Sequence, residues 1–148
     1  MKKFILVVAI AGSLVSGQAI AACTDTRLDA AAISALLGGN TVCVPAVTVP
    51  TMTWQELHEG SSTSTSGVLT DFKRGPGPGP DPSKPVGTWS VSAAKPKGKD
   101  ASVIHTYSGG GGTYTYTVHG TGVVGTNHSF CSAGPEIVAR VKSLGGAC

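Results

Sequence analysis

The stretch Ser102–His119, SVIHTYSGGGGTYTYTVH, decides the fold predicted for this chain. On both sides of its Ser108–Gly112 segment, large apolar or aromatic residues alternate with polar ones. A period of two is typical of a β-strand, because successive side chains point to opposite faces of a sheet. Two such runs joined by a glycine-rich segment predict a β-hairpin.

The pairing of the two strands follows from the same alternation. If Thr106 lies opposite Thr113, the threonines share one face and the aromatic side chains share the other. A slip by one residue would mix tyrosines with threonines on both faces. We therefore expect the first register, with an inward face made of Val103, His105, Tyr107, Tyr114, Tyr116 and Val118.

Other segments have the length, alternation or flanking turn residues of short strands. They are Thr41–Val44, Met52–Glu59, Val68–Arg74, Val86–Val91, His128–Cys131 and Glu136–Lys142. One turn of helix within Met52–Glu59 and a helix after Pro135 are the alternatives at two of them. Segments rich in Gly, Pro, Ser, Thr or Lys predict edges, turns or exposed loops at Val47–Pro50, Gly60–Gly67, Gly75–Pro82 and Lys95–Asp100.

One segment, residues 26–37, has helical periodicity instead. Thr24 to Thr26 supply N-cap candidates, and Gly38-Gly39-Asn40 follows as a stop signal. The apolar residues recur at spacings of three and four and would form one side of a helix: Leu28, Ala32, Ile33, Leu36 and Leu37.

These elements predict a mainly β (α+β) fold. One N-terminal helix would pack on seven or eight antiparallel strands, arranged as a curved sheet or a small up-and-down β-barrel. Closure into a barrel would leave no unpaired strand edge. With 21 glycines and nine prolines in 148 residues, the composition also fits many short strands joined by tight turns.

Residues 1–22 have the pattern of a bacterial signal peptide. Lys2 and Lys3 precede an apolar run from Phe4 to Ala11, and small residues lead up to Ala22. The run is shorter than the roughly 20 residues that cross a bilayer as a helix. We therefore expect a secreted or periplasmic protein with a single domain at residues 23–148 and no transmembrane helix in the mature chain.

The four cysteines predict two disulfides, because an even number in an exported domain is typical of a disulfide framework. Three pairings are possible. We favour Cys23 with Cys43 and Cys131 with Cys148, because each bond would close a short loop. Cys23 also follows Ile20-Ala21-Ala22, which fits a bacterial lipidation site. Acylation of Cys23 would make the protein an outer-membrane lipoprotein and is the alternative.

The charge of the mature chain argues against two classes of partner. Without Lys2 and Lys3, the 11 basic residues fall to nine, against eight acidic ones. A nearly neutral domain lacks the positive charge that attracts nucleic acid or anionic membranes. We expect neither as a partner.

Histidine and carboxylate side chains could form a catalytic or metal-binding site. His119 and His128 could meet across a hairpin, and His58 lies near Glu56 and Asp71 in the predicted strands. A periplasmic enzyme or metal-binding protein that uses these residues is therefore an alternative. However, the chain has no Cys-x-x-Cys pair, nucleophile elbow, His-Glu-x-x-His or phosphate-binding loop. We predict no catalytic residue, no metal site and no cofactor.

Aromatic side chains are the main candidates for ligand contacts, because a small barrel can either fill its interior with them or line a cavity. We predict a non-enzymatic binding module for a protein or a small apolar ligand. An inhibitor of hydrolases is one form of it, and a structural envelope component is a further alternative. The candidate binding residues are Trp54, His58, Trp89, His105, Tyr107, Tyr114 and Tyr116.

Several motifs carry a resemblance. Gly39-Asn40-Thr41-Val42-Cys43, Val86-Gly87-Thr88-Trp89 and Phe130-Cys131 occur in an order that resembles small secreted bacterial proteins of uncharacterised function. This resemblance spans most of the mature chain and implies no catalytic residue. Gly87-x-Trp89 also resembles the lipocalin signature, which in that family lies on the first strand of the barrel, whereas here it falls in mid-chain.

Overall fold

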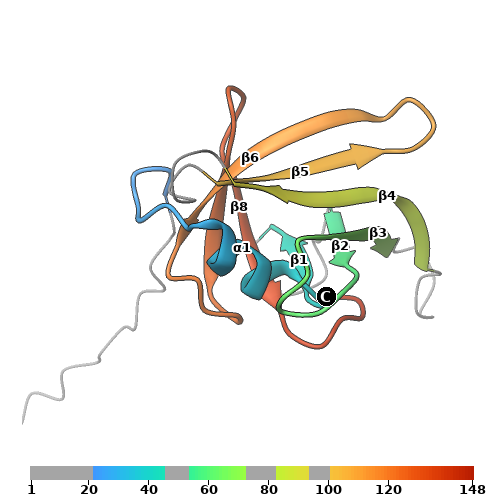
Figure 1. The fold of residues 1–148 in the computed structure, drawn as a ribbon, viewed down its shortest axis with the longest axis horizontal. Helices are drawn as coiled ribbons and strands as arrows, with labels where there is room; N and C mark the ends of the chain where they lie inside the picture. The colour runs from blue at the N-terminus through green and yellow to red at the C-terminus, as the bar shows by residue number, and fades with distance from the viewer. Residues whose placement is uncertain (1–21, 46–53, 73–82, 94–100) are drawn as a thin grey trace, which may run out of the picture.

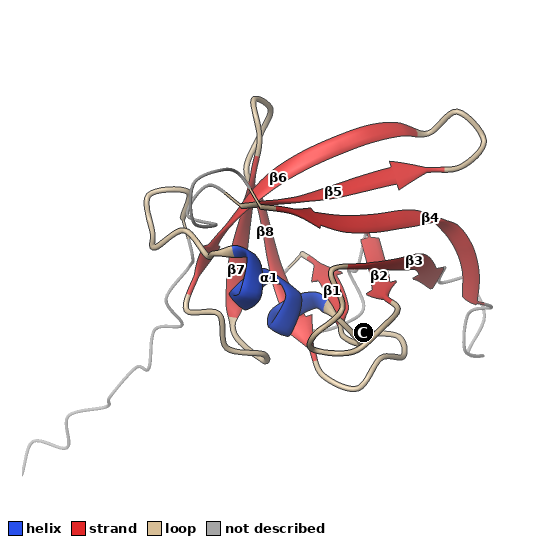
Figure 2. Cartoon of the chain, in the orientation of Figure 1, coloured by secondary structure: helices blue, strands red, loops and turns tan. Residues whose placement is uncertain are grey.

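The computed structural model describes residues 22–45, 54–72, 83–93 and 101–148. These residues form one short helix and eight strands that close into an antiparallel barrel (Figure 1). The predicted mainly β fold is confirmed, and the sheet takes the barrel form (Figure 2). Residues 1–21 of the expected signal peptide, and the segments Val47–Pro50, Gly75–Pro82 and Lys95–Asp100, lie outside the described residues.

The strands follow one another around the barrel in chain order, each antiparallel to the next, and the last pairs with the first. The alternatives of a helical turn near Trp54 and of a helix after Pro135 are wrong, because both segments pair as strands. The strands are β1 (Thr41–Val44), β2 (Trp54–His58), β3 (Ser66–Phe72), β4 (Ser83–Ser92), β5 (Ser102–Tyr107), β6 (Gly112–Gly120), β7 (Asn127–Cys131) and β8 (Ile137–Lys142).

The β5–β6 hairpin has the predicted register, with Thr106 opposite Thr113 and His105 opposite Tyr114. Its inward face is buried at the base of the hairpin, where Val103, His105 and Val118 are inaccessible to solvent. Burial decreases toward the turn, where Tyr114 is 48% exposed. The hairpin therefore contributes both to the core and to the open end of the barrel.

The helix α1 (Ala30–Leu37) begins later than predicted. Asp29, rather than a threonine, is the N-cap, and its side chain accepts a hydrogen bond from the Ala32 amide at 2.8 Å. The residues before it pair with the barrel wall, since the Leu28 amide donates to the Val118 carbonyl at 2.8 Å. These residues therefore pair with β6 instead of extending the helix.

One end of the barrel is closed by α1, which packs against β4 and β5 away from the β5–β6 turn (Figure 1). Ile33, Leu36 and Leu37 on α1 are fully buried, as is Phe130 on β7. Their burial gives this end of the barrel an apolar core that excludes water.

The Gly87-x-Trp89 motif has a structural role in this core. A Cβ atom at Gly87 would lie 2.1 Å from the Thr106 carbonyl oxygen, so only glycine allows β4 and β5 to approach so closely. Two residues further along, Trp89 is 1% exposed, and its indole N–H donates to the Glu59 carbonyl at 3.1 Å. The motif therefore sets the packing of the wall beneath α1.

The disulfides join Cys23 to Cys131 and Cys43 to Cys148, so the pairing we favoured is wrong. Local loops were expected, but both terminal segments run back along the barrel wall. At the N-terminus, the Thr26 carbonyl accepts from Gly120 on β6, and at the C-terminus the Cys148 amide donates to the Gln55 side chain at 2.6 Å. A lipid thioether at Cys23 would need the sulfur atom that this disulfide uses.

The two disulfides indicate an oxidising compartment. Within the parts of the chain that the structure describes, no helix has the length and apolar character to cross a bilayer.

Removal of either disulfide should destabilise the barrel strongly, because the bonded cysteines are 108 and 105 residues apart in sequence. For loops of this length the chain-entropy model gives a loss of about 5 kcal/mol in the free energy of unfolding. Urea unfolding of Cys43→Ala/Cys148→Ala and of Cys23→Ala/Cys131→Ala, followed by circular dichroism, measures both losses. The two double variants should lose similar amounts, and a loss below about 1 kcal/mol would contradict long-range cross-linking.

Candidate functional site

A cavity of about 700 Å³ opens at the barrel end opposite α1. We call it the mouth cavity. Its volume falls within the range of about 300 to 1,000 Å³ that is usual for small-molecule sites. It lies between the end of β1, the starts of β2, β4 and β8, and the β5–β6 hairpin, and its lining residues are Val44, Trp54, Lys84, Pro85, Val86, Tyr107, Ser108, Gly109, Gly111, Tyr114, Tyr116 and Ile137.

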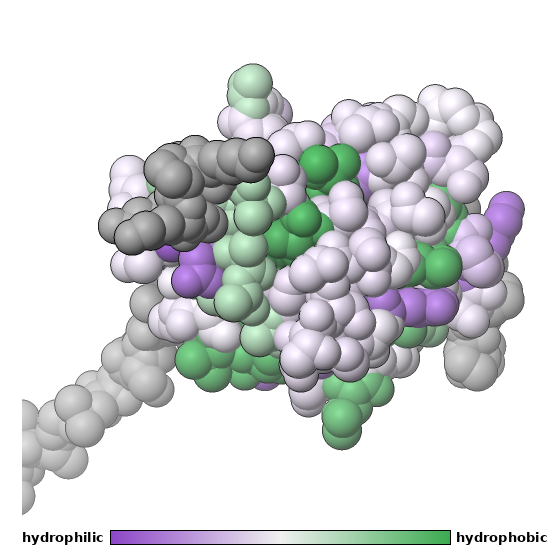
Figure 3. All heavy atoms as spheres, in the orientation of Figure 1, coloured by the Kyte–Doolittle hydropathy of each residue, from purple (hydrophilic) through white to green (hydrophobic). Residues whose placement is uncertain are grey.

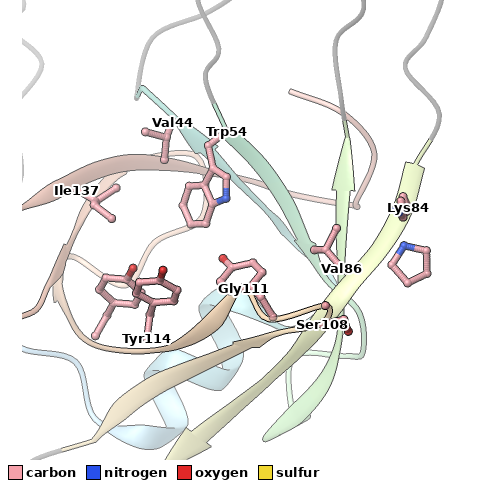
Figure 4. Close-up of a pocket in the computed structure, with 12 residues that line it drawn as sticks. Val44, Trp54, Lys84, Val86, Ser108, Gly111, Tyr114 and Ile137 are labelled. Atoms are coloured by element: carbon pink, nitrogen blue, oxygen red, sulfur yellow. The ribbon is translucent and has the colours of Figure 1, made fainter.

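Four aromatic rings form much of the wall of the mouth cavity. Tyr107 and Tyr114 meet edge to face, with ring centroids 5.8 Å apart, and Tyr116 contacts Phe130 of the core in the same way. In Figure 4, Trp54 extends into the cavity from above, with Ile137 to its left and Tyr114 below it. Rings that pack against one another in this way form a wall of fixed shape.

A buried carboxyl group lies behind this wall. Glu56 on β2 is only 2% exposed, and it accepts a hydrogen bond from the Tyr107 hydroxyl at 2.9 Å. Burial raises the pKa of Glu56 from 4.5 to about 7, while hydrogen bonds from Tyr107 and Trp54 lower it and the nearby charge of Asp71 raises it further. Around neutral pH, Glu56 is therefore poised between its two protonation states.

Two histidines meet in the interior beyond Glu56. His58 on β2 and His105 on β5 are fully buried, and their Nε2 atoms are 3.0 Å apart. One ring must donate and the other accept, so the accepting imidazole must be neutral. Burial accordingly lowers the pKa of both: that of His105 falls to about 4, and that of His58 falls well below its usual 6.5, with a further contribution from His105.

Polar groups form a row of contacts that leads from this histidine pair toward the cavity. His105 Nδ1 lies 4.0 Å from a Glu56 oxygen, which in turn holds the Tyr107 hydroxyl. Within the described residues, the Nδ1 atoms of both histidines have no hydrogen-bond partner. Buried polar groups destabilise a fold unless most of them have hydrogen-bond partners. Because the pKa values of these groups differ between the folded and unfolded chain, their protonation makes the stability of the fold depend on pH.

The structure separates the predicted binding residues into two groups. Trp54, Tyr107, Tyr114 and Tyr116 line the mouth cavity. In contrast, His58, Trp89 and His105 lie in the barrel interior, where His58 packs edge to face on Trp89 at 5.4 Å between ring centroids.

The sequence indicated Glu56 only in the catalytic alternative and did not link it to the predicted binding residues. The only available signal was the alternation of Trp54, Glu56 and His58, which placed them on one strand face. Asp71 lies opposite Glu56 in the β2–β3 register, so the carboxylates of the catalytic alternative do come close. His105, which no sequence pattern linked to them, joins from the opposite wall.

The other candidate histidine pair does not form a site. His119 contacts the Asp25 carbonyl and the Thr117 hydroxyl, each at 2.9 Å. His128 lies on the adjacent strand and accepts from the Gly122 amide at 3.1 Å. Among the residues described, no group of three or more His, Cys, Asp or Glu side chains is arranged to hold a metal ion.

Replacing Glu56 by glutamine should remove one contribution to the pH dependence of the stability of the barrel, and the difference between the two proteins measures that contribution. The unfolded chain loses the Glu56 proton near pH 4.5, whereas the folded barrel keeps it to about pH 7. The wild type therefore loses stability relative to Glu56→Gln as the pH rises from 4.5 to 7, by about 3 kcal/mol in total.

Urea unfolding of both proteins between pH 4.5 and 8 measures this difference. The buried histidines act in the opposite direction, since their lowered pKa values destabilise the fold as the pH falls below 6.5. Their effect is common to both proteins and cancels in the comparison. A difference that does not change with pH would show that Glu56 is not held protonated by burial.

Comparisons with known proteins do not indicate a function for this chain. No protein-family model matches the chain, and no curated protein or solved structure shows significant similarity to it. The resemblance to small secreted bacterial proteins therefore stays a prediction, and the function must be inferred from the mouth cavity and the groups behind it.

Proposed function

We propose that this protein is an exported, non-enzymatic binding module that holds a small, largely apolar ligand in the mouth cavity. The observation that carries the proposal is a cavity of about 700 Å³ with an aromatic wall, in a barrel whose other end is filled by α1. An interior that is packed at one end and hollow at the other is suited to enclosing a ligand.

The chemistry of the lining supports an apolar ligand. Val44, Val86 and Ile137 contribute aliphatic surface beside the aromatic rings. Burial of apolar ligand surface against such a lining contributes about 25 cal/mol per Å². The hydroxyl groups of Tyr114 and Tyr116 can orient a polar substituent on the ligand, whereas that of Tyr107 is bound to Glu56.

The position of the ionisable groups supports binding over catalysis. Glu56, His58 and His105 are not part of the cavity lining and lie behind the aromatic wall. A ligand in the cavity would contact Trp54 and Tyr107 before it reached these groups. They are placed to fix the wall rather than to touch a reacting atom.

The surface supports a small ligand over a protein partner. The exposed large apolar side chains among the described residues come from different strands and loops: Val68, Tyr114, Val123 and Leu144. On the face seen in Figure 3, apolar side chains form separate small areas among polar ones. Protein-binding surfaces usually present one contiguous apolar patch.

Two features support export to the periplasm or the exterior. The chain begins with a signal-peptide pattern, and the mature part is cross-linked by two disulfides. The disulfide at Cys23 favours cleavage without lipidation.

The neutral fluorescent probe N-phenyl-1-naphthylamine should bind the wild-type protein and gain fluorescence, with a dissociation constant in the micromolar range. Val86→Trp should abolish this binding, because a larger side chain fills the cavity that Val86 lines. The matched control is Val123→Trp, a change of the same size at a residue that is 56% exposed and outside the cavity. Equal binding by both variants, or no binding by the wild type, would overturn the proposed function.

A further inference from the structure

The aromatic wall of the mouth cavity contacts an ionisable carboxyl group, that of Glu56. Tyr107 and Trp54 present their rings to the cavity, the Tyr107 hydroxyl donates a hydrogen bond to Glu56, and Trp54 lies close enough to help lower the pKa of this carboxyl group. When Glu56 is ionised, a carboxylate thus lies behind two rings. Its field adds to the negative face of each ring, which already attracts cations.

The neighbouring charges do not neutralise Glu56. On β3, Asp71 lies opposite Glu56, and on β4, Lys84 lies opposite Asp71. These two carry opposite charges, so the row across β2, β3 and β4 keeps one negative charge in excess when Glu56 is ionised. On β1, the residue opposite Glu56 is the apolar Val42.

The remaining titratable groups that face Glu56 are neutral near pH 7. His58 and His105 have lowered pKa values because they are buried. Tyr107 and Tyr116 have raised pKa values, also mainly because of burial, so their hydroxyl groups stay protonated. Among the described residues behind the aromatic wall, no group carries a positive charge near pH 7 to pair with the Glu56 carboxylate, and Lys84, the cation in the cavity lining, lies opposite Asp71.

We propose that the mouth cavity selects organic cations, namely quaternary or substituted ammonium groups on an apolar or aromatic body, over neutral ligands of the same shape. This inference rests on the proposed function, because it names the ligand class of the same cavity. Three tyrosines and Trp54 supply ring faces for the ammonium group, and Glu56 supplies the compensating charge. The apolar lining accommodates the body of the ligand.

Cation binding should depend on pH in a defined direction. A bound cation favours the ionised form of Glu56, so it lowers the pKa of this carboxyl group and releases a proton. Affinity should therefore rise as the pH increases toward about 7, where Glu56 ionises, and then level off. Below that pH, the affinity for a cation should fall by up to about tenfold for each unit of pH.

Phenyltrimethylammonium and tert-butylbenzene are suitable probes, because they have nearly the same shape and only the first is charged. Neither titrates, so any pH dependence belongs to the protein. Their affinities are obtained from displacement of N-phenyl-1-naphthylamine between pH 5.5 and 8.5. We expect about tenfold tighter binding of the cation at pH 8 and a much smaller preference at pH 5.5.

Glu56→Gln tests the source of the preference, because it removes the charge but keeps an oxygen that can accept from Tyr107. The ratio of its affinities for the cation and for tert-butylbenzene should fall most of the way to one, and this ratio should not depend on pH. Glu59→Gln is the matched control, since Glu59 is exposed and lies outside the cavity lining. This control should keep the wild-type preference.

The outcomes separate the two proposals. Equal affinity of the wild type for both probes at pH 8 would overturn the selection of cations and leave the small-ligand function standing. A preference that persists in Glu56→Gln would overturn the role of the carboxylate. Absence of binding by the fluorescent probe would overturn the proposed function itself. If Glu56→Gln fails to fold, the pH profile of the wild type alone decides.

Discussion

The pairing of β8 with β1 is the constraint on which the rest of the structure depends. It closes the sheet, so every inward side chain shares one interior, and strands that are not neighbours face each other across it. The contact between His58 on β2 and His105 on β5 exists only because of this closure. The same holds for the bond from Tyr107 to Glu56.

The interior is layered along the barrel axis. Below α1 it is apolar and closely packed, in the middle it holds the histidine pair and Glu56, and at the mouth it is aromatic and hollow. Each layer determines a property of the next one. The packed end removes water from the middle layer and shifts its pKa values, and the middle layer holds the polar ends of the rings that shape the cavity.

Sequence alone predicted what depends on local alternation. The β5–β6 register, the strand at Ile137–Lys142 and the common face of Trp54, Glu56 and His58 all follow from a period of two. What depends on distant parts of the chain could not be predicted. The helix started later because β6 pairs with residues before Asp29, and the disulfides differ because both terminal segments follow the barrel wall. The meeting of Glu56 with His105 and Tyr107 required knowledge of how many strands separate β2 from β5.

The disulfides also interleave along the chain, since one joins Cys23 to Cys131 and the other Cys43 to Cys148. Any single cut of the backbone between Cys23 and Cys148 falls inside at least one of the two covalent loops. No such cut can release a fragment, whereas two local loops would let the halves of the molecule separate after one cut between them. A protein built in this way tolerates a proteolytic nick in a loop while its wall and its cavity remain tethered together.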